Sequence, residues 1–95
     1  MGNYIYVSQL LNTFTLQYLK MLVYPIYRKL SNDKSFYRIL SENEFEEIQC
    51  IGSTRIKTHC KAEKYPEILR IKEMVSCNVP FEQISEEEYY AQELA

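Results

Sequence analysis

The stretch that decides the fold is Ser35–Gly52, SFYRILSENEFEEIQCIG, in a chain of 95 residues. Its first residues alternate and are aromatic or β-branched, so Phe36–Leu40 is predicted to form a short strand. Ser41 follows this strand and stands three residues before Glu44. That spacing is typical of a capping box, in which serine and glutamate side chains bond the first backbone N–H groups of a helix.

The second half of the same stretch carries apolar residues at steps of three. Phe45, Ile48 and Ile51 have the spacing of one face of a helix. Gly52 comes directly after them, where a helix often ends on a residue in the left-handed conformation. We therefore expect a strand, a cap, a helix and a stop within these eighteen residues.

Upstream of this stretch, the sequence predicts a β-hairpin over Ile26 to Leu40. Ile26–Leu30 alternates and can pair with Phe36–Leu40, and turn-forming residues fill the connection between them. The tip and strands of this hairpin are basic. They hold Arg28, Lys29, Lys34 and Arg38.

Three further helices are predicted outside the hairpin. Residues 9–22 carry one apolar stripe, and Pro25 ends that helix. Pro66 suits the first position of a second helix. Ser85 and Glu88 repeat the capping box before a last helix over 86–94. The expected buried stripe of the second helix is Ile68, Leu69, Ile71 and Val75.

The segment between Gly52 and the second helix is ambiguous. Residues 54–59 alternate like an exposed strand, but they also suit the start of a helix. Residues 53–65 therefore stay open between strand and helix.

The composition indicates one folded domain over 1–95, with 46% hydrophobic and 25% charged residues. Three cysteines at irregular spacing argue against a disulfide framework and favour a reducing, cytoplasmic location. Polar residues interrupt the apolar N-terminal run, so we expect no membrane segment.

The sequence shows no catalytic constellation, so we expect a protein that is not an enzyme. His59 and Cys60 are neighbours, but zinc sites usually pair ligands two to four residues apart, and no such pair exists here. Two glycines cannot supply a phosphate-binding loop. No metal and no cofactor are therefore expected.

Charge is distributed unevenly along the chain. Residues 1–40 carry five basic and one acidic side chain, whereas residues 41–95 carry six basic and twelve acidic ones. A basic hairpin can lie along a nucleic-acid backbone and neutralise phosphates, with Tyr27 and Tyr37 packed on sugar. The other interpretation is that edge strands carry Lys and Arg to discourage aggregation.

Part of the chain resembles the MerR-type winged-helix domain. The residues that carry the resemblance are the segment YIYVSQLL at 4–11, TLQYLKML at 15–22, Pro25, and FYRILSENEFEEI at 36–48. They are similar to the family's opening segment, its second helix, its proline turn, and its wing with the following capped helix. The connection between residues 11 and 15 is shorter than in the family, and Ser35 replaces the wing glycine.

This resemblance over residues 4–51 implies a DNA-binding transcription regulator. The expected fold is a small α+β domain of three to four helices with a basic β-hairpin, with an all-α fold as the alternative. The expected function is non-enzymatic binding of double-stranded DNA. The alternative is a small protein-interaction module or inhibitor of a larger protein, for example as a nucleic-acid mimic, docking through tyrosines and the acidic residues 66–95. A homodimer stays open. The expected nucleic-acid contacts are Gln17, Lys20, Arg28, Lys29, Lys34, Arg38 and Tyr37.

Overall fold

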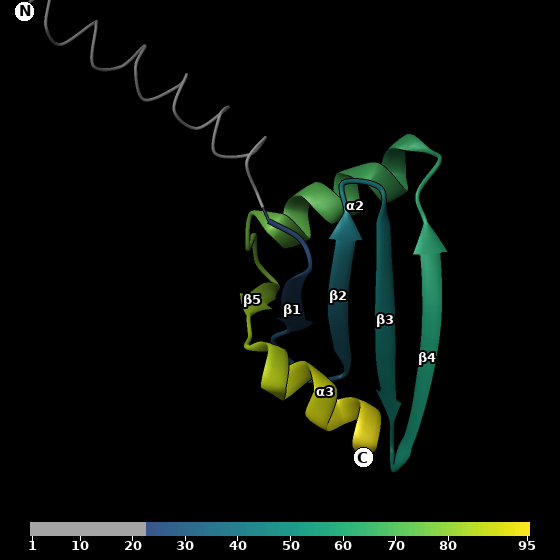
Figure 1. The fold of residues 1–95 in the computed structure, drawn as a ribbon, viewed down its shortest axis with the longest axis vertical. Helices are drawn as coiled ribbons and strands as arrows, with labels where there is room; N and C mark the ends of the chain where they lie inside the picture. Colours follow the sequence, from purple (N-terminus) through teal and green to yellow (C-terminus); the bar gives the residue numbers. More distant parts are fainter. Residues whose placement is uncertain (1–22) are drawn as a thin grey trace, which may run out of the picture.

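The computed structural model describes residues 23–95, which form one antiparallel sheet with a helix on each face (Figure 1). The strand order is β4-β3-β2-β1-β5, so consecutive strands pair as hairpins and β5 joins at the far edge. The elements are β1 Ile26–Leu30, β2 Ser35–Ser41, β3 Glu44–Ile51, β4 Thr54–Lys61, α2 Tyr65–Val75, β5 Phe81–Gln83 and α3 Glu86–Leu94.

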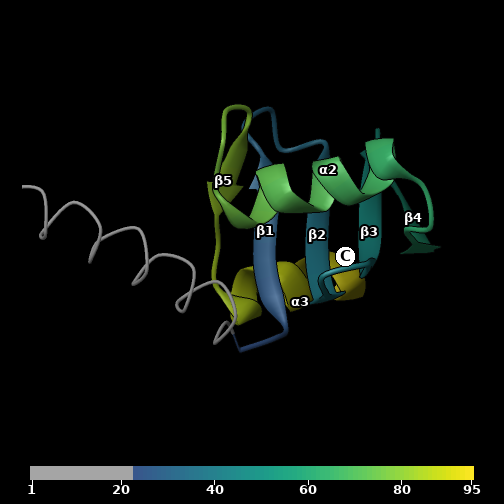
Figure 2. The same cartoon turned by 90° about the horizontal axis from the view of Figure 1, so that it is seen from above.

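The two helices cover opposite faces of the sheet, as Figure 2 shows from above. The face under α2 holds the larger apolar cluster, and the face under α3 holds a smaller one. The first cluster comprises Tyr37, Ile39, Phe45, Ala62, Ile71, Met74 and Phe81. The second comprises Phe36, Ile48 and Tyr89. Because side chains of a strand alternate between faces, β2 supplies both clusters from neighbouring positions.

The predicted helix after Ser41 is wrong, because this segment is β3. Glu42 and Asn43 form a two-residue turn between β2 and β3, with Ser41 paired to Glu44. The Ser41 hydroxyl accepts from the Asn43 backbone N–H at 3.3 Å, so it stabilises a turn instead of a helix end. Serine favours both settings, since its hydroxyl bonds a nearby backbone N–H in each.

Apolar residues three positions apart also fit a strand that is buried on both faces. Phe45 packs under α2 and Ile48 packs on the α3 side, three residues apart and on opposite faces. In a helix the same spacing would put both side chains on one face. Because a helix covers each face of the sheet, apolar residues with the spacing of a helix can all be buried in a strand.

The predicted fold is wrong because the segment expected to be a capped helix is the strand β3. In the described residues the sheet has five strands and there are two helices, instead of three to four helices with a hairpin, and the all-α alternative is wrong as well. The capped helix on which the winged-helix resemblance depended is absent from this segment. The predicted helix over 9–22 lies outside the described residues.

Other expectations are confirmed locally. The hairpin pairs Ile26 with Ile39 and Lys29 with Phe36. The helix α2 has proline in its first turn, although Leu69 is 38% exposed and does not belong to the buried stripe. The open segment after Gly52 is the strand β4. The predicted last helix is α3, and the Ser85 hydroxyl accepts from the Glu88 N–H at its start.

Gly52 is required by the turn between β3 and β4, where its φ is +59°. A Cβ at this position would meet no atom within 4 Å, so any penalty for a side chain comes from the backbone alone. We expect Gly52→Ala to lower the free energy of unfolding by about 1–2 kcal/mol in urea titrations. The neighbouring Ser53→Ala is the control and should stay within about 0.5 kcal/mol. Equal stability of both variants would contradict this account of the turn.

Candidate interaction surface

The basic residues predicted to bind nucleic acid do not share one face of the hairpin. Arg28 points to the α2 side, because its guanidinium bonds the end of that helix. Lys29 and Arg38 lie on the α3 side, where Lys29 is near Glu88 and Arg38 lies across from Tyr27. Gln17 and Lys20 lie outside the described residues.

Arg28 acts as a structural link between β1 and the C-terminus of α2. Its Nε donates to the Met74 carbonyl at 2.9 Å and its Nη2 donates to the Val75 carbonyl at 3.1 Å. The last carbonyls of a helix have no partner within the helix, and they carry the negative end of its dipole. A positive side chain at this place therefore stabilises the helix end.

Two of the other hairpin cations bind carboxylates of the same chain. Lys29 forms ion pairs with Asp33 at 2.6 Å and with Glu88 at 3.8 Å. Arg38 is paired with Glu46 at 2.8 Å, and its side chain is 28% exposed. Lys34 lies at the exposed tip of the hairpin.

Tyr37 is fully buried and cannot pack on a ligand at the surface. Its hydroxyl accepts from Arg70 Nη2 at 2.8 Å, and the Arg70 guanidinium lies 5.4 Å from the centre of its ring. Burial raises the pKa of Tyr37, although the positive charge of Arg70 acts in the opposite direction. Tyr37 therefore belongs to the core of the α2 face.

The hydrogen bonds of Arg28 lead to a stability prediction. We expect Arg28→Ala to lower the free energy of unfolding by about 1.5–3 kcal/mol, because two helix-end carbonyls lose a charged donor. Lys34→Ala removes a cation from the same hairpin at its exposed tip and should change stability by less than about 0.5 kcal/mol. Chemical denaturation of both variants measures the difference. A DNA-contact residue without a structural role would give two equally stable variants.

The outer edge of β4 is a second exposed feature of residues 23–95. Among the strands of residues 23–95, this eight-residue strand ends the sheet and pairs only with β3. Just beyond the end of β4, the Ala62 N–H donates to the Asn43 carbonyl at 2.6 Å, so Ala62 and Asn43 form a hydrogen-bonded pair. Because bonded pairs alternate in an antiparallel ladder, the even-numbered residues of β4 bond β3. The backbone groups that point away from β3 therefore belong to Arg55, Lys57, His59 and Lys61.

The same four residues place basic side chains along the α3 side of this edge. Arg55 Nε donates to Gln92 Oε1 at 3.2 Å. His59 Nε2 is 2.5 Å from Glu44 Oε2. Lys61 has no ion pair within the described part of the chain. The opposite side of the strand is less polar, and Ile56 there is 42% exposed.

Lys57 lies at the centre of this basic row and is bound by two carboxylates. Its Nζ is 2.9 Å from Glu46 Oε2, and it also pairs with Glu93 of α3. The hydrogen bonds to Glu93 and Glu46 raise the pKa of Lys57. Burial alone would raise the pKa of Glu46, but Lys57 and Arg38 hold it below its ordinary value. Carboxylates of the same chain therefore compensate the positive charge at the centre of the edge.

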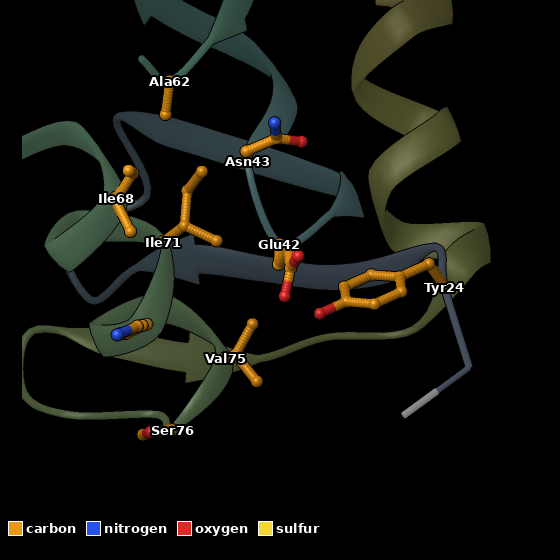
Figure 3. A pocket seen from close by; sticks show the side chains of 9 residues that line it. Tyr24, Glu42, Asn43, Ala62, Ile68, Ile71, Val75 and Ser76 are labelled. Carbon is orange, nitrogen blue, oxygen red and sulfur yellow. The ribbon is translucent and has the colours of Figure 1, made fainter. Parts of the chain in front are cut away.

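A cavity of about 600 Å³ opens between α2 and the turn that joins β2 to β3 (Figure 3). Ile68, Ile71 and Val75 form its helical wall, and Tyr24 and Glu42 face them from the other side. Burial and the nearby Glu42 raise the pKa of Tyr24. The cavity is apolar with a polar rim, and it has no arrangement of groups that suggests a reaction.

The alternation along β4 can be measured by hydrogen exchange. We expect the amides of Ile56, Thr58 and Cys60 to exchange slowly, because they donate to β3. The amides of Arg55, Lys57 and His59 should exchange much faster, because they face solvent. Residue-resolved exchange followed by nuclear magnetic resonance tests this pattern. Uniform protection along β4 would mean that another strand already covers the edge.

Other signs of chemistry are missing from the described residues. Among residues 23–95, no three His, Cys, Asp or Glu side chains gather where they could hold a metal ion. In the same range, no helix has the length and apolar character needed to cross a membrane. The chain matches no family model, no curated protein and no solved structure.

Proposed function

We propose that this domain is a non-enzymatic protein-interaction module that binds an extended segment of another protein as an added strand along β4. The observation that carries the proposal is the outer edge of β4, which no strand of residues 23–95 covers and which offers the outward backbone groups of four alternate residues. In strand addition, main-chain hydrogen bonds supply affinity and alternate side chains supply specificity. An eight-residue edge is long enough for several such bonds.

The two edges of the sheet differ in what they offer. The strand β5 at the opposite edge has three residues, so it can form very few backbone hydrogen bonds with an added strand. Native proteins commonly shorten or charge an edge to prevent uncontrolled pairing. The edge of β4 is long, and the side chains beside it are basic. These charges oppose pairing between identical edges and leave the edge open to a complementary segment.

This surface differs from the two surfaces expected from the sequence. Tyr27, Tyr89 and Tyr90 contact one another with ring centres 5.4–6.1 Å apart, so they serve the packing of α3. The hairpin cations Arg28 and Arg38 are bound within the chain. Binding of DNA stays a prediction, and no contact among the described residues favours it over strand addition.

A proline at one outward N–H separates strand addition from other ways of binding. His59→Pro removes a backbone donor that β3 does not use, whereas His59→Ala removes the same side chain and keeps that donor. Nine-residue peptides selected from a random displayed library against the full chain serve as probes. We expect His59→Ala to bind them like the native chain and His59→Pro to bind about tenfold more weakly.

Circular dichroism and urea unfolding are the controls that check whether both His59 variants keep the native sheet. Thr58→Pro is a further control, because it removes a bond to β3 and should destabilise the fold itself. Peptides that bind His59→Pro as tightly as His59→Ala would overturn the proposal. A library that gives no peptide binder after repeated selection would also overturn it.

A further inference from the structure

We infer that the strand bound by β4 carries two carboxylates six residues apart, one facing Arg55 and the other facing Lys61, with uncharged side chains between them. This inference rests on the proposed function and names the chemistry of the partner. The two basic residues lie at the two ends of β4 and on the same side of the sheet. Their separation along the strand is about 20 Å.

The cations at the two ends of the edge form no ion pair with a carboxylate of residues 23–95, unlike Lys57 at its centre. Arg55 bonds a neutral amide, Gln92, and the Gly52 carbonyl at 3.3 Å. Lys61 is exposed and forms no ion pair within residues 23–95. Glu44 lies across the ladder from it, but the Glu44 carboxylate contacts His59 instead. A carboxylate directly across the ladder from either one gains a favourable cross-strand pair.

The centre of the edge disfavours a carboxylate. Lys57 already binds Glu46 and Glu93, and His59 contacts Glu44. A further carboxylate facing Lys57 or His59 would lie near these three negative groups. Like charges at such positions are destabilising, so the central residues of the partner that face this side are uncharged.

The opposite side of the added strand meets a less polar row. Ile56 is 42% exposed, and Thr58 beside it is exposed as well. β-Branched side chains pack well against such a half-buried surface. The partner therefore alternates, with two end carboxylates on one side and residues such as valine or threonine on the other.

A second copy of this chain is a poor occupant of the same edge. Antiparallel pairing centred on Thr58 would place Arg55 opposite Lys61 of the second copy, at both ends of the ladder. Like charges directly opposite one another are destabilising in a sheet. Charge therefore selects against self-pairing along β4.

Two synthetic peptides of identical composition test the inference with the full chain. The first is Thr-Glu-Val-Thr-Val-Thr-Val-Glu-Thr, with capped ends and glutamates six residues apart. The second is Thr-Thr-Val-Glu-Val-Glu-Val-Thr-Thr, with glutamates two residues apart on the same side. Fluorescence anisotropy at low salt should show about three- to tenfold tighter binding of the first peptide, the effect of two exposed ion pairs. In Lys61→Gln this preference should fall to about half on a logarithmic scale.

The outcomes separate this inference from the function on which it rests. Equal binding of both peptides, with weaker binding to His59→Pro than to His59→Ala, would overturn the carboxylate spacing and leave strand addition standing. Binding of both peptides that ignores the proline would overturn strand addition as well. Sedimentation that shows a dimer of the full chain, lost in His59→Pro, would overturn the inference in favour of a second copy.

Discussion

The structure depends on burying both faces of one strand, β2. Tyr37 and Ile39 are fully buried under α2, while Phe36 packs with Ile48 and Tyr89 under α3. Fully burying such a side chain contributes about 1.5–3 kcal/mol, so neighbouring residues of one strand anchor two separate clusters. A small chain can reach this burial only if a helix covers each face. The order of the remaining elements follows from that requirement.

Two arginines attach distant elements to the hairpin around this strand. Arg28 of β1 binds the last carbonyls of α2, and Arg70 of α2 lies over Tyr37 and Phe45. Arg28 is half-buried and the Arg70 side chain is 45% exposed, and each guanidinium can bond several groups at once. The positive charges of these two arginines therefore serve internal cohesion. Charge counted along a sequence does not reveal this use.

The sequence could predict the parts whose signals are local. The β1–β2 hairpin, the proline at the start of α2 and the serine cap of α3 each depend on a few adjacent residues. The segment 44–51 could not be assigned in this way, because its apolar spacing fits one face of a helix and two faces of a strand equally well. Only the second covering helix decides between them. The position of β4 at the edge of the sheet could likewise not be predicted from the sequence, since it depends on the order of the strands.

The unequal edges of the sheet limit the size of any assembly built upon it. Within residues 23–95, the sheet has one long edge, β4, and one short edge, β5. A filament of stacked sheets needs two matching edges on every unit, so that each addition creates a new site. In the strand addition that we propose, the segment that covers β4 belongs to another protein, so the new outer edge carries the partner's side chains and not a second basic row. Further copies of this chain then have no copy of β4 to extend, which favours a complex of two chains over a fibre.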